Sequence, residues 1–138
     1  MRRLPTDERG GSSLAQAAIV TPIIVMVALA LVNMAVAGFA AVWANNAANF
    51  GARMGAVTQG DAAQAAAAAA WQSLSAAPVG TYQVDIVSPG GVPGSTLGVR
   101  VRWEVPNWFG GIAAAFYDTP NPPTWHGEAT AFFRQEGW

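Results

Sequence analysis

The chain has 138 residues, of which 52% are hydrophobic and only 11% are charged. Soluble domains carry about 25% charged residues, so this chain lacks the charge needed to cover a large water-facing surface. Seven Arg, no Lys and eight acidic residues give a net charge of −1. This balance excludes a basic surface for nucleic-acid phosphates. The absence of Cys excludes disulfides, thiolate nucleophiles and Cys-ligated metal centres.

A long uncharged run dominates the N-terminal third. No charged residue occurs between Arg9 and Arg53. A bilayer core of roughly 30 Å needs about 20 apolar residues in a helix. The segment Ile19–Ala41 is long enough to span a membrane, and the helix is expected to continue on both sides. Pro22 is expected to bend this helix near its start, because proline leaves one carbonyl unpaired.

Two other interpretations of the run are less favourable. A cleaved secretory signal has an apolar core of about 7–15 residues. The residues 35–37 (Ala-Val-Ala) resemble a signal cleavage site, but the run before them is longer than that and continues afterwards. A buried core helix would need a second layer around it, which a chain of this length cannot supply.

The flanking charges predict the orientation. Arg2, Arg3 and Arg9 precede the span, and Arg53 is the one Arg close after it. The positive-inside rule therefore predicts a cytoplasmic N-terminus. The organisation that we predict is a cytoplasmic segment of residues 1–13, a transmembrane and extended helix of residues 14–56, and a small extracytoplasmic domain of residues 57–138.

Beyond the span, the pattern predicts an α+β domain. A break at residues 58–61 precedes an alanine-rich helix over residues 62–74, with Asp61 or Thr58 as its cap. We expect this helix to pack closely on the domain's own sheet. Residues 82–86 and 97–105 alternate in hydrophobicity and predict an antiparallel hairpin, and residues 124–135 predict a third strand.

The segment Trp108–Tyr117 is apolar and aromatic. It is expected to form a short helix, and three roles stay open for it: packing on the sheet, contact with the membrane interface, or contact with a partner.

No catalytic or metal site is evident. His126 is the only His, and although Glu128 lies beside it, the sequence offers no matching nucleophile or orienting group. We interpret His126 as a solvated residue of a strand face. One His and scattered carboxylates give no metal-ligand spacing. We therefore predict no enzyme activity, no cofactor and no small-molecule substrate.

Taken in order, these segments resemble the TadE-like (TadE/TadG) minor pilins, or pseudopilins, of the tight-adherence (Tad/Flp) pilus machinery. The family opens with Arg-Gly, small residues, a Glu and an apolar run containing Pro, and here residues 9–22 read RGGSSLAQAAIVTP. After its span the family has Ala-Ala-x-x-Gly-Ala-Arg, which residues 47–53 match. Its C-terminal pattern, near Ala-x-Ala-x-x-Arg-x-Glu, is similar to residues 129–136.

The resemblance implies a pilin-like fold and a role in pilus assembly, initiation or anchoring at the bacterial cytoplasmic membrane. Its partners would be membrane lipid, other pilin subunits and Tad assembly proteins. It also implies Gly11 as the last residue of a leader that a prepilin peptidase removes. Gln16 departs from the family, which has Glu at this position. Removal of the leader and retention of the N-terminus therefore both stay open.

Small residues at helical spacing predict an assembly surface on the long helix, because they allow helices to approach closely in lipid. The residues that we assign to helix packing and assembly are Gln16, Pro22, Ala40, Ala44, Ala47, Ala48, Gly51 and Arg53. A competing hypothesis is a membrane-anchored extracytoplasmic binding or sensor module without any role in pili.

Overall fold

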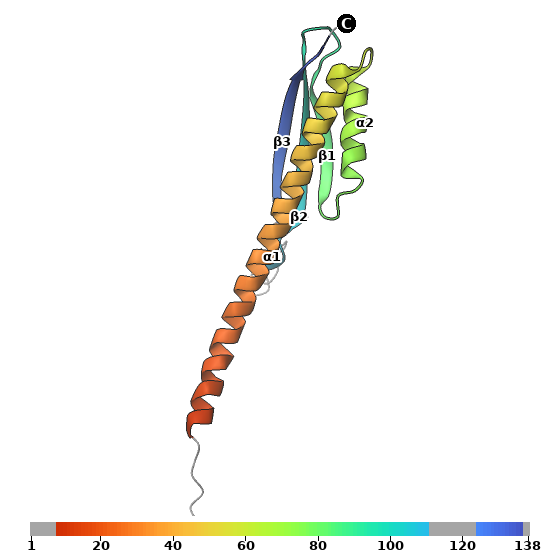
Figure 1. Ribbon diagram of the computed structural model, residues 1–138. Coiled ribbons are helices and arrows are strands. Elements are labelled where there is room, and N and C mark those ends of the chain that lie inside the picture. The colour runs from red at the N-terminus through yellow and green to blue at the C-terminus, as the bar shows by residue number, and fades with distance from the viewer. Residues whose placement is uncertain (1–7, 111–123, 137–138) are drawn as a thin grey trace, which may run out of the picture.

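The computed structural model describes residues 8–110 and 124–136, with side chains from residue 14 onward (Figure 1). It contains two helices, α1 (Glu8–Val57) and α2 (Ala62–Leu74). Three strands follow: β1 (Thr81–Pro89), β2 (Thr96–Pro106) and β3 (Thr124–Arg134). The predicted α+β class is confirmed, with one long apolar helix followed by a small domain. Residues 108–110 are helical, and the rest of the expected helix up to Tyr117 lies outside the described residues.

α1 is one continuous helix of 50 residues that contains Pro22. At 1.5 Å per residue its length is about 75 Å, far more than a domain of this size needs. Figure 1 shows the consequence: the N-terminal half of α1 extends away from the domain, whereas its C-terminal half lies along the sheet. The same helix therefore belongs both to the free segment and to the folded domain.

The sheet is an antiparallel meander with the strand order β1-β2-β3. Two glycines of the sheet each lie beneath the aromatic ring of the residue opposite them on the neighbouring strand. Trp103 is opposite Gly127, and a Cβ added to that glycine would lie 2.6 Å from the indole ring. Phe132 is opposite Gly98 on the other face, where an added Cβ would lie 2.5 Å from the phenyl ring. The missing side chains thus make room for the rings, a pairing that stabilises glycine in strands.

The two helices cover one face of this sheet, and no helix of the described residues covers the other. α1 contacts β2 and β3, while α2 packs beside α1 and also contacts β1. The strands supply the large core side chains and the helices supply mostly alanine. The fully buried core residues of β2 are Leu97, Val99, Val101 and Val105. The alternation that predicted the hairpin therefore places the apolar face of β2 against α1.

α2 begins and ends where the sequence predicted. The Asp61 carboxylate accepts a hydrogen bond from the backbone N–H of Gln64 at 3.1 Å, which makes Asp61 the N-cap. The buried face of α2 consists of Ala62, Ala66, Ala69, Ala70 and Leu74. This face packs chiefly on α1 and less on the sheet, because the sheet face is already occupied by the wider contact with α1.

Candidate membrane anchor and outer sheet face

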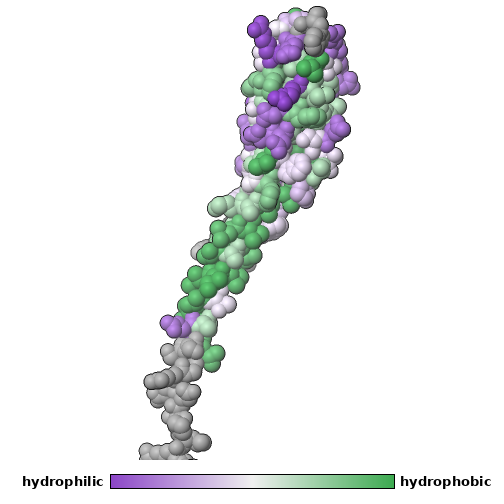
Figure 2. All heavy atoms as spheres, in the orientation of Figure 1, coloured by the Kyte–Doolittle hydropathy of each residue, from purple (hydrophilic) through white to green (hydrophobic). Residues whose placement is uncertain are grey.

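The part of α1 that extends away from the domain, residues 14–32, is called the free half below, and it presents an apolar surface on all sides. Almost every side chain between Leu14 and Val32 is exposed, including Ile19 at 68% and Ile24 at 61%. α1 is the one helix of the described chain that is long and apolar enough to cross a membrane, with a mean hydropathy of 2.5 in its most apolar part. Figure 2 shows this segment as a hydrophobic zone below a domain whose visible face mixes hydrophilic and hydrophobic residues.

The structure divides the predicted segment Ile19–Ala41 into an exposed part and a part that packs beside the domain. Ala37 is 7% exposed and Ala40 is fully buried, because both pack beside Val105 of β2. The C-terminal part of the predicted segment Ile19–Ala41, from Asn33 onward, is therefore flanked by the domain, whereas the part before it is largely exposed. The exposed segment 14–32 is about 28 Å long at 1.5 Å per residue, which matches a hydrocarbon core of roughly 30 Å.

Asn33 joins the free half of α1 to the domain. Its side chain is 1% exposed, and its Oδ1 accepts a hydrogen bond from the backbone N–H of Trp108 at 2.9 Å. Its Nδ2 donates to Asn107 Oδ1 at 3.4 Å, and that oxygen also accepts from the N–H of Gly110 at 2.9 Å. The polar residue in the middle of the apolar run is thus a structural contact between α1 and the end of β2.

The small-residue stripe on α1 is buried inside the protein. Ala40, Ala44 and Ala47 are fully buried and Ala48 is 1% exposed, since the sheet and α2 cover them. The expectation that this stripe forms a surface for other subunits has to be corrected. Small side chains do allow close approach here, but the neighbours that approach are α2 and the sheet of the same chain.

Close contact between the helices centres on two glycines. A Cβ added to Gly51 would lie 2.7 Å from the carbonyl oxygen of Ala66 and 2.9 Å from the Cβ of Ala70. A Cβ added to Gly55 would lie 2.7 Å from the carbonyl oxygen of Ala62. The spacing Gly-x-x-x-Gly over residues 51–55 could have indicated this contact from the sequence, yet Gly55 was missing from the assigned residues.

The remaining assigned residues lie apart from one another. Gln16 is exposed on the free half of α1, and Pro22 lies inside the same half. Gly11 lies near the start of α1, where side chains are not described. The guanidinium of Arg53 lies 5.8 Å from the centre of the Phe133 ring, a cation–π contact between α1 and β3. A groove of about 370 Å³ beside this pair is lined by Asn46, Asn49, Phe50, Arg53 and Phe133.

The outer face of the sheet carries an ion-pair network across all three strands. Arg102 on β2 lies 3.2 Å from Asp85 on β1 and 4.0 Å from Glu128 on β3. Arg100 also approaches Glu128, at 3.6 Å. These side chains are substantially exposed, so each pair contributes about 0.2–1 kcal/mol.

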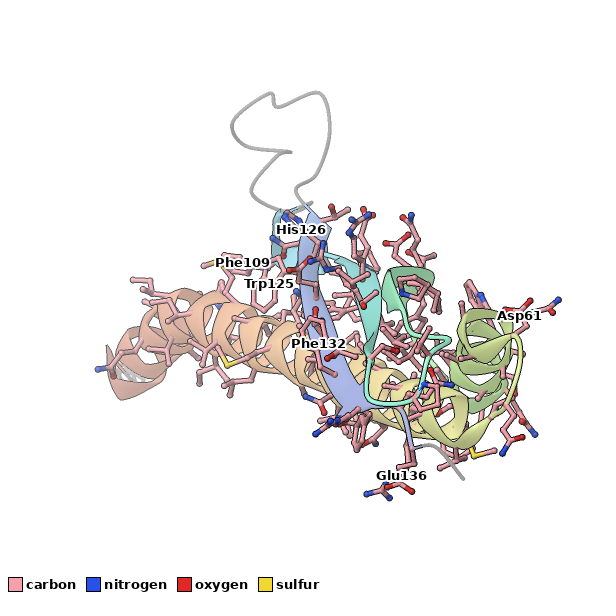
Figure 3. The ribbon with its side chains drawn as sticks, turned by 90° about the horizontal axis from the view of Figure 1, so that it is seen from above. Asp61, Phe109, Trp125, His126, Phe132 and Glu136 are labelled. Atoms are coloured by element: carbon pink, nitrogen blue, oxygen red, sulfur yellow. The ribbon has the colours of Figure 1, made fainter. Side chains whose placement is uncertain are left out.

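A shallow polar hollow of about 610 Å³ adjoins this network. His126 lies on its wall, opposite Glu104 in the strand register, and Figure 3 shows His126 beside Trp125 at the same end of the sheet. Among the described residues, no three His, Cys, Asp or Glu side chains come together to hold a metal ion. The polar residues of the hollow are Thr81, Gln83, Arg102, Glu104, His126 and Glu128.

Two polar residues that the sequence did not single out hold the ends of the domain. Gln135 is 6% exposed, donates from Nε2 to the carbonyl oxygen of Thr58 at 3.0 Å and accepts from the N–H of Gly91. It therefore links the helix turn, the hairpin loop and the C-terminal strand. At the other end, the Tyr82 hydroxyl donates to the carbonyl oxygen of Val79 at 2.8 Å, and partial burial raises the pKa of Tyr82 above its ordinary value.

No protein-family model, curated protein or solved structure matches this chain. What the structure establishes is a single long apolar helix that continues into a small α+β domain with a polar outer face.

Proposed function

We propose that the chain is a single-pass minor pilin, or pseudopilin, that acts in the assembly, initiation or anchoring of a Tad-type pilus. The N-terminal half of α1 lies in the bacterial cytoplasmic membrane, and the domain lies on the extracytoplasmic side. The protein works by binding other subunits and Tad assembly proteins through this helix rather than by catalysis.

The observation that carries the proposal is the continuity of α1. The exposed apolar segment and the helix that forms the domain core are the same helix, without a linker between them. A flexible tether would let a binding domain move independently of its anchor. A continuous helix instead fixes the domain to the membrane segment, so force or displacement on one is transmitted to the other. This property suits a subunit of a fibre that is extracted from, or held in, the membrane.

The exposed side chains of α1 offer the free half for contact with other helices. The stripe of small residues is buried, but Gln16, Ile19 and Ile24 remain exposed. In lipid, polar side chains such as Gln form hydrogen bonds between helices. Gln16 can accept a hydrogen bond from a neighbouring subunit, although it cannot form the ion pair that a Glu would form.

A membrane-anchored binding module is the second candidate function, and the polar hollow beside His126 is the observation that favours it. The hollow carries charges of both signs and is open to solvent, so it suits a polar ligand or a peptide but does not select one of a particular size. Small-molecule sites, in contrast, are usually enclosed and mostly apolar. We therefore rank this candidate below the pilus role.

Deletion and complementation separate the two functions. In the native bacterium, removing the gene should abolish or reduce surface pili counted by electron microscopy, and the wild-type chain should restore them. A chain with Arg102→Ala and His126→Ala, which alters the hollow and the exposed ion pairs beside it but not α1, should restore them as well. A chain with Ile24→Asp, which places a charge in the free half of α1, should not. Normal pili in the deletion strain would overturn the pilus role. Loss of rescue by the hollow variant alone, with normal expression and membrane localisation, would favour the binding module.

A further inference from the structure

We propose that Trp108 and Phe109 form a contact with the lipid headgroup layer that sets the height and tilt of the domain on the membrane. Both side chains are exposed, Trp108 at 49% and Phe109 at 39%. They lie directly after β2, at the end of the sheet from which the free half of α1 emerges. The inference rests on the membrane anchorage of α1 but not on any role in pili.

The depth of these residues follows from the length of the free helix. The exposed segment from Leu14 to Val32 fills a hydrocarbon core, as its length of about 28 Å indicates. Asn33 is the first fully buried residue after it, and a polar amide belongs at the boundary with the headgroups rather than within the hydrocarbon. Because Trp108 N–H donates to Asn33 at 2.9 Å, the backbone of Trp108 lies at the same depth.

Asn33 and Asn107 fix this depth. Asn107 Oδ1 accepts from the N–H of Gly110 and from the side chain of Asn33. The turn that carries Trp108 and Phe109 is therefore held by a hydrogen bond within residues 107–110 and is attached to α1 through Asn33. Figure 3 places Phe109 beside α1, nearer to its free half than Trp125 or Phe132 is.

The side chains have the chemistry of interfacial anchors. Trp has an apolar body with one N–H donor, and such side chains gather at the headgroup level of membranes. Phe adds apolar area without a polar group. Other exposed aromatic side chains of the described domain, Phe50, Trp71 and Phe132, lie on α1, α2 and β3, whereas Trp108 and Phe109 follow β2 at the end from which the free half of α1 emerges. The occupant that we assign to this pair is accordingly lipid, not a protein partner.

The depth of these residues can be measured by fluorescence quenching in vesicles. Because the chain has no Cys, a single introduced Cys is labelled at that position alone. The full chain with Phe109→Cys, Val92→Cys or Ile24→Cys is labelled with an environment-sensitive fluorophore and reconstituted without other proteins. The vesicles contain phosphatidylcholine and phosphatidylglycerol, with either ordinary or brominated acyl chains. Val92 is 66% exposed and Ile24 61%, so both positions tolerate a label.

The expected result is strong quenching by brominated lipid at position 24, intermediate quenching at position 109 and none at position 92. Adding Asn33→Ala should reduce the quenching at 109, whereas Asn46→Ala on an exposed part of α1 should not. Quenching at 24 with none at 109 would overturn the proposed lipid contact while leaving the anchor intact, and would point to a protein partner for this pair. Absence of quenching at 24 would instead contradict the membrane anchorage itself. Quenching at 109 that Asn33→Ala leaves unchanged would contradict the role of Asn33.

Discussion

A Cβ atom on Gly55 would lie 2.7 Å from the carbonyl oxygen of Ala62, so α1 and α2 meet there almost backbone to backbone. The same glycine lies against the side chain of Leu97, which is fully buried. The absence of a side chain at Gly55, as at Gly51, thus allows α1 and α2 to pack this closely.

Replacing Gly55 with Ala should destabilise the domain by about 1–3 kcal/mol, because the added methyl group meets backbone that cannot rotate away. The matched control is Gly38→Ala in the same helix, where an added Cβ has no neighbour within 4 Å. That variant should gain up to about 1 kcal/mol from helix propensity. Denaturant unfolding of the detergent-solubilised chain measures both, and equal effects from the two variants would contradict the close contact.

Loss of the Asn33 side chain should destabilise the junction between α1 and β2. Asn33→Ala removes the acceptor of the part-buried hydrogen bond from the Trp108 N–H, at a cost of about 0.5–1.5 kcal/mol. Asn46→Ala, at an exposed position of the same helix, should change the free energy of unfolding by less than about 0.5 kcal/mol. Hydrogen exchange at the amide of Trp108 provides the local readout, and unchanged protection in Asn33→Ala would show that this hydrogen bond does not hold the turn.

The ion-pair network on the outer face should be weak and sensitive to salt. Glu128→Gln removes the carboxylate that both Arg100 and Arg102 approach, and should cost about 0.2–1 kcal/mol per pair at low salt. The cost should shrink at high ionic strength, because exposed charges are screened. Glu104→Gln on the same face is the control, since Glu104 forms no ion pair with any described residue. A loss from Glu128→Gln that persists in high salt would argue against an electrostatic cause.

Tyr82 should make the domain sensitive to alkali. Burial raises its pKa in the folded state above the ordinary value of 10.0, so folding favours the protonated hydroxyl. Below pH 10 this contribution to stability is complete, and it is lost as the pH rises through the raised pKa of the folded state. Unfolding measured from pH 8 to 12 should show a steeper alkaline loss in the wild type than in Tyr82→Phe. Parallel curves for the two proteins would exclude Tyr82 as the cause.

The sequence predicted local structure well wherever one periodicity dominated. The alternation in residues 97–105 identifies the buried face of β2. The sequence also offers Asp61 or Thr58 as the cap of α2, and the structure shows Asp61, whose carboxylate accepts from a backbone N–H only three residues away. Contacts between distant segments were not predictable in this way. Asn33 and Trp108 are 75 residues apart, and nothing in either local pattern indicates the hydrogen bond between them.

The long helix is where the sequence misled most. Hydrophobicity alone cannot distinguish a side chain that faces lipid from one that faces a sheet, because both environments are apolar. The predicted span Ile19–Ala41 therefore includes Ala40, which packs beside the sheet, and the sequence assigns Ala40, Ala44 and Ala47 to partners although their own domain covers them. Gln135 was overlooked for a different reason: a polar residue at the end of a strand has no sequence signal for the three segments that it joins.

The central claim is that the free half of α1 crosses the cytoplasmic membrane with the domain outside, and thiol labelling in cells tests it most directly. Val92→Cys and Ser12→Cys provide single thiols on the two sides of the free segment, in a chain that has no Cys of its own. With the outer layer of the cells permeabilised, a membrane-impermeant thiol reagent should label position 92 at once. It should label position 12 only after the cytoplasmic membrane is also opened. Equal labelling of both positions in cells with an intact cytoplasmic membrane, or labelling of position 12 alone, would contradict the account.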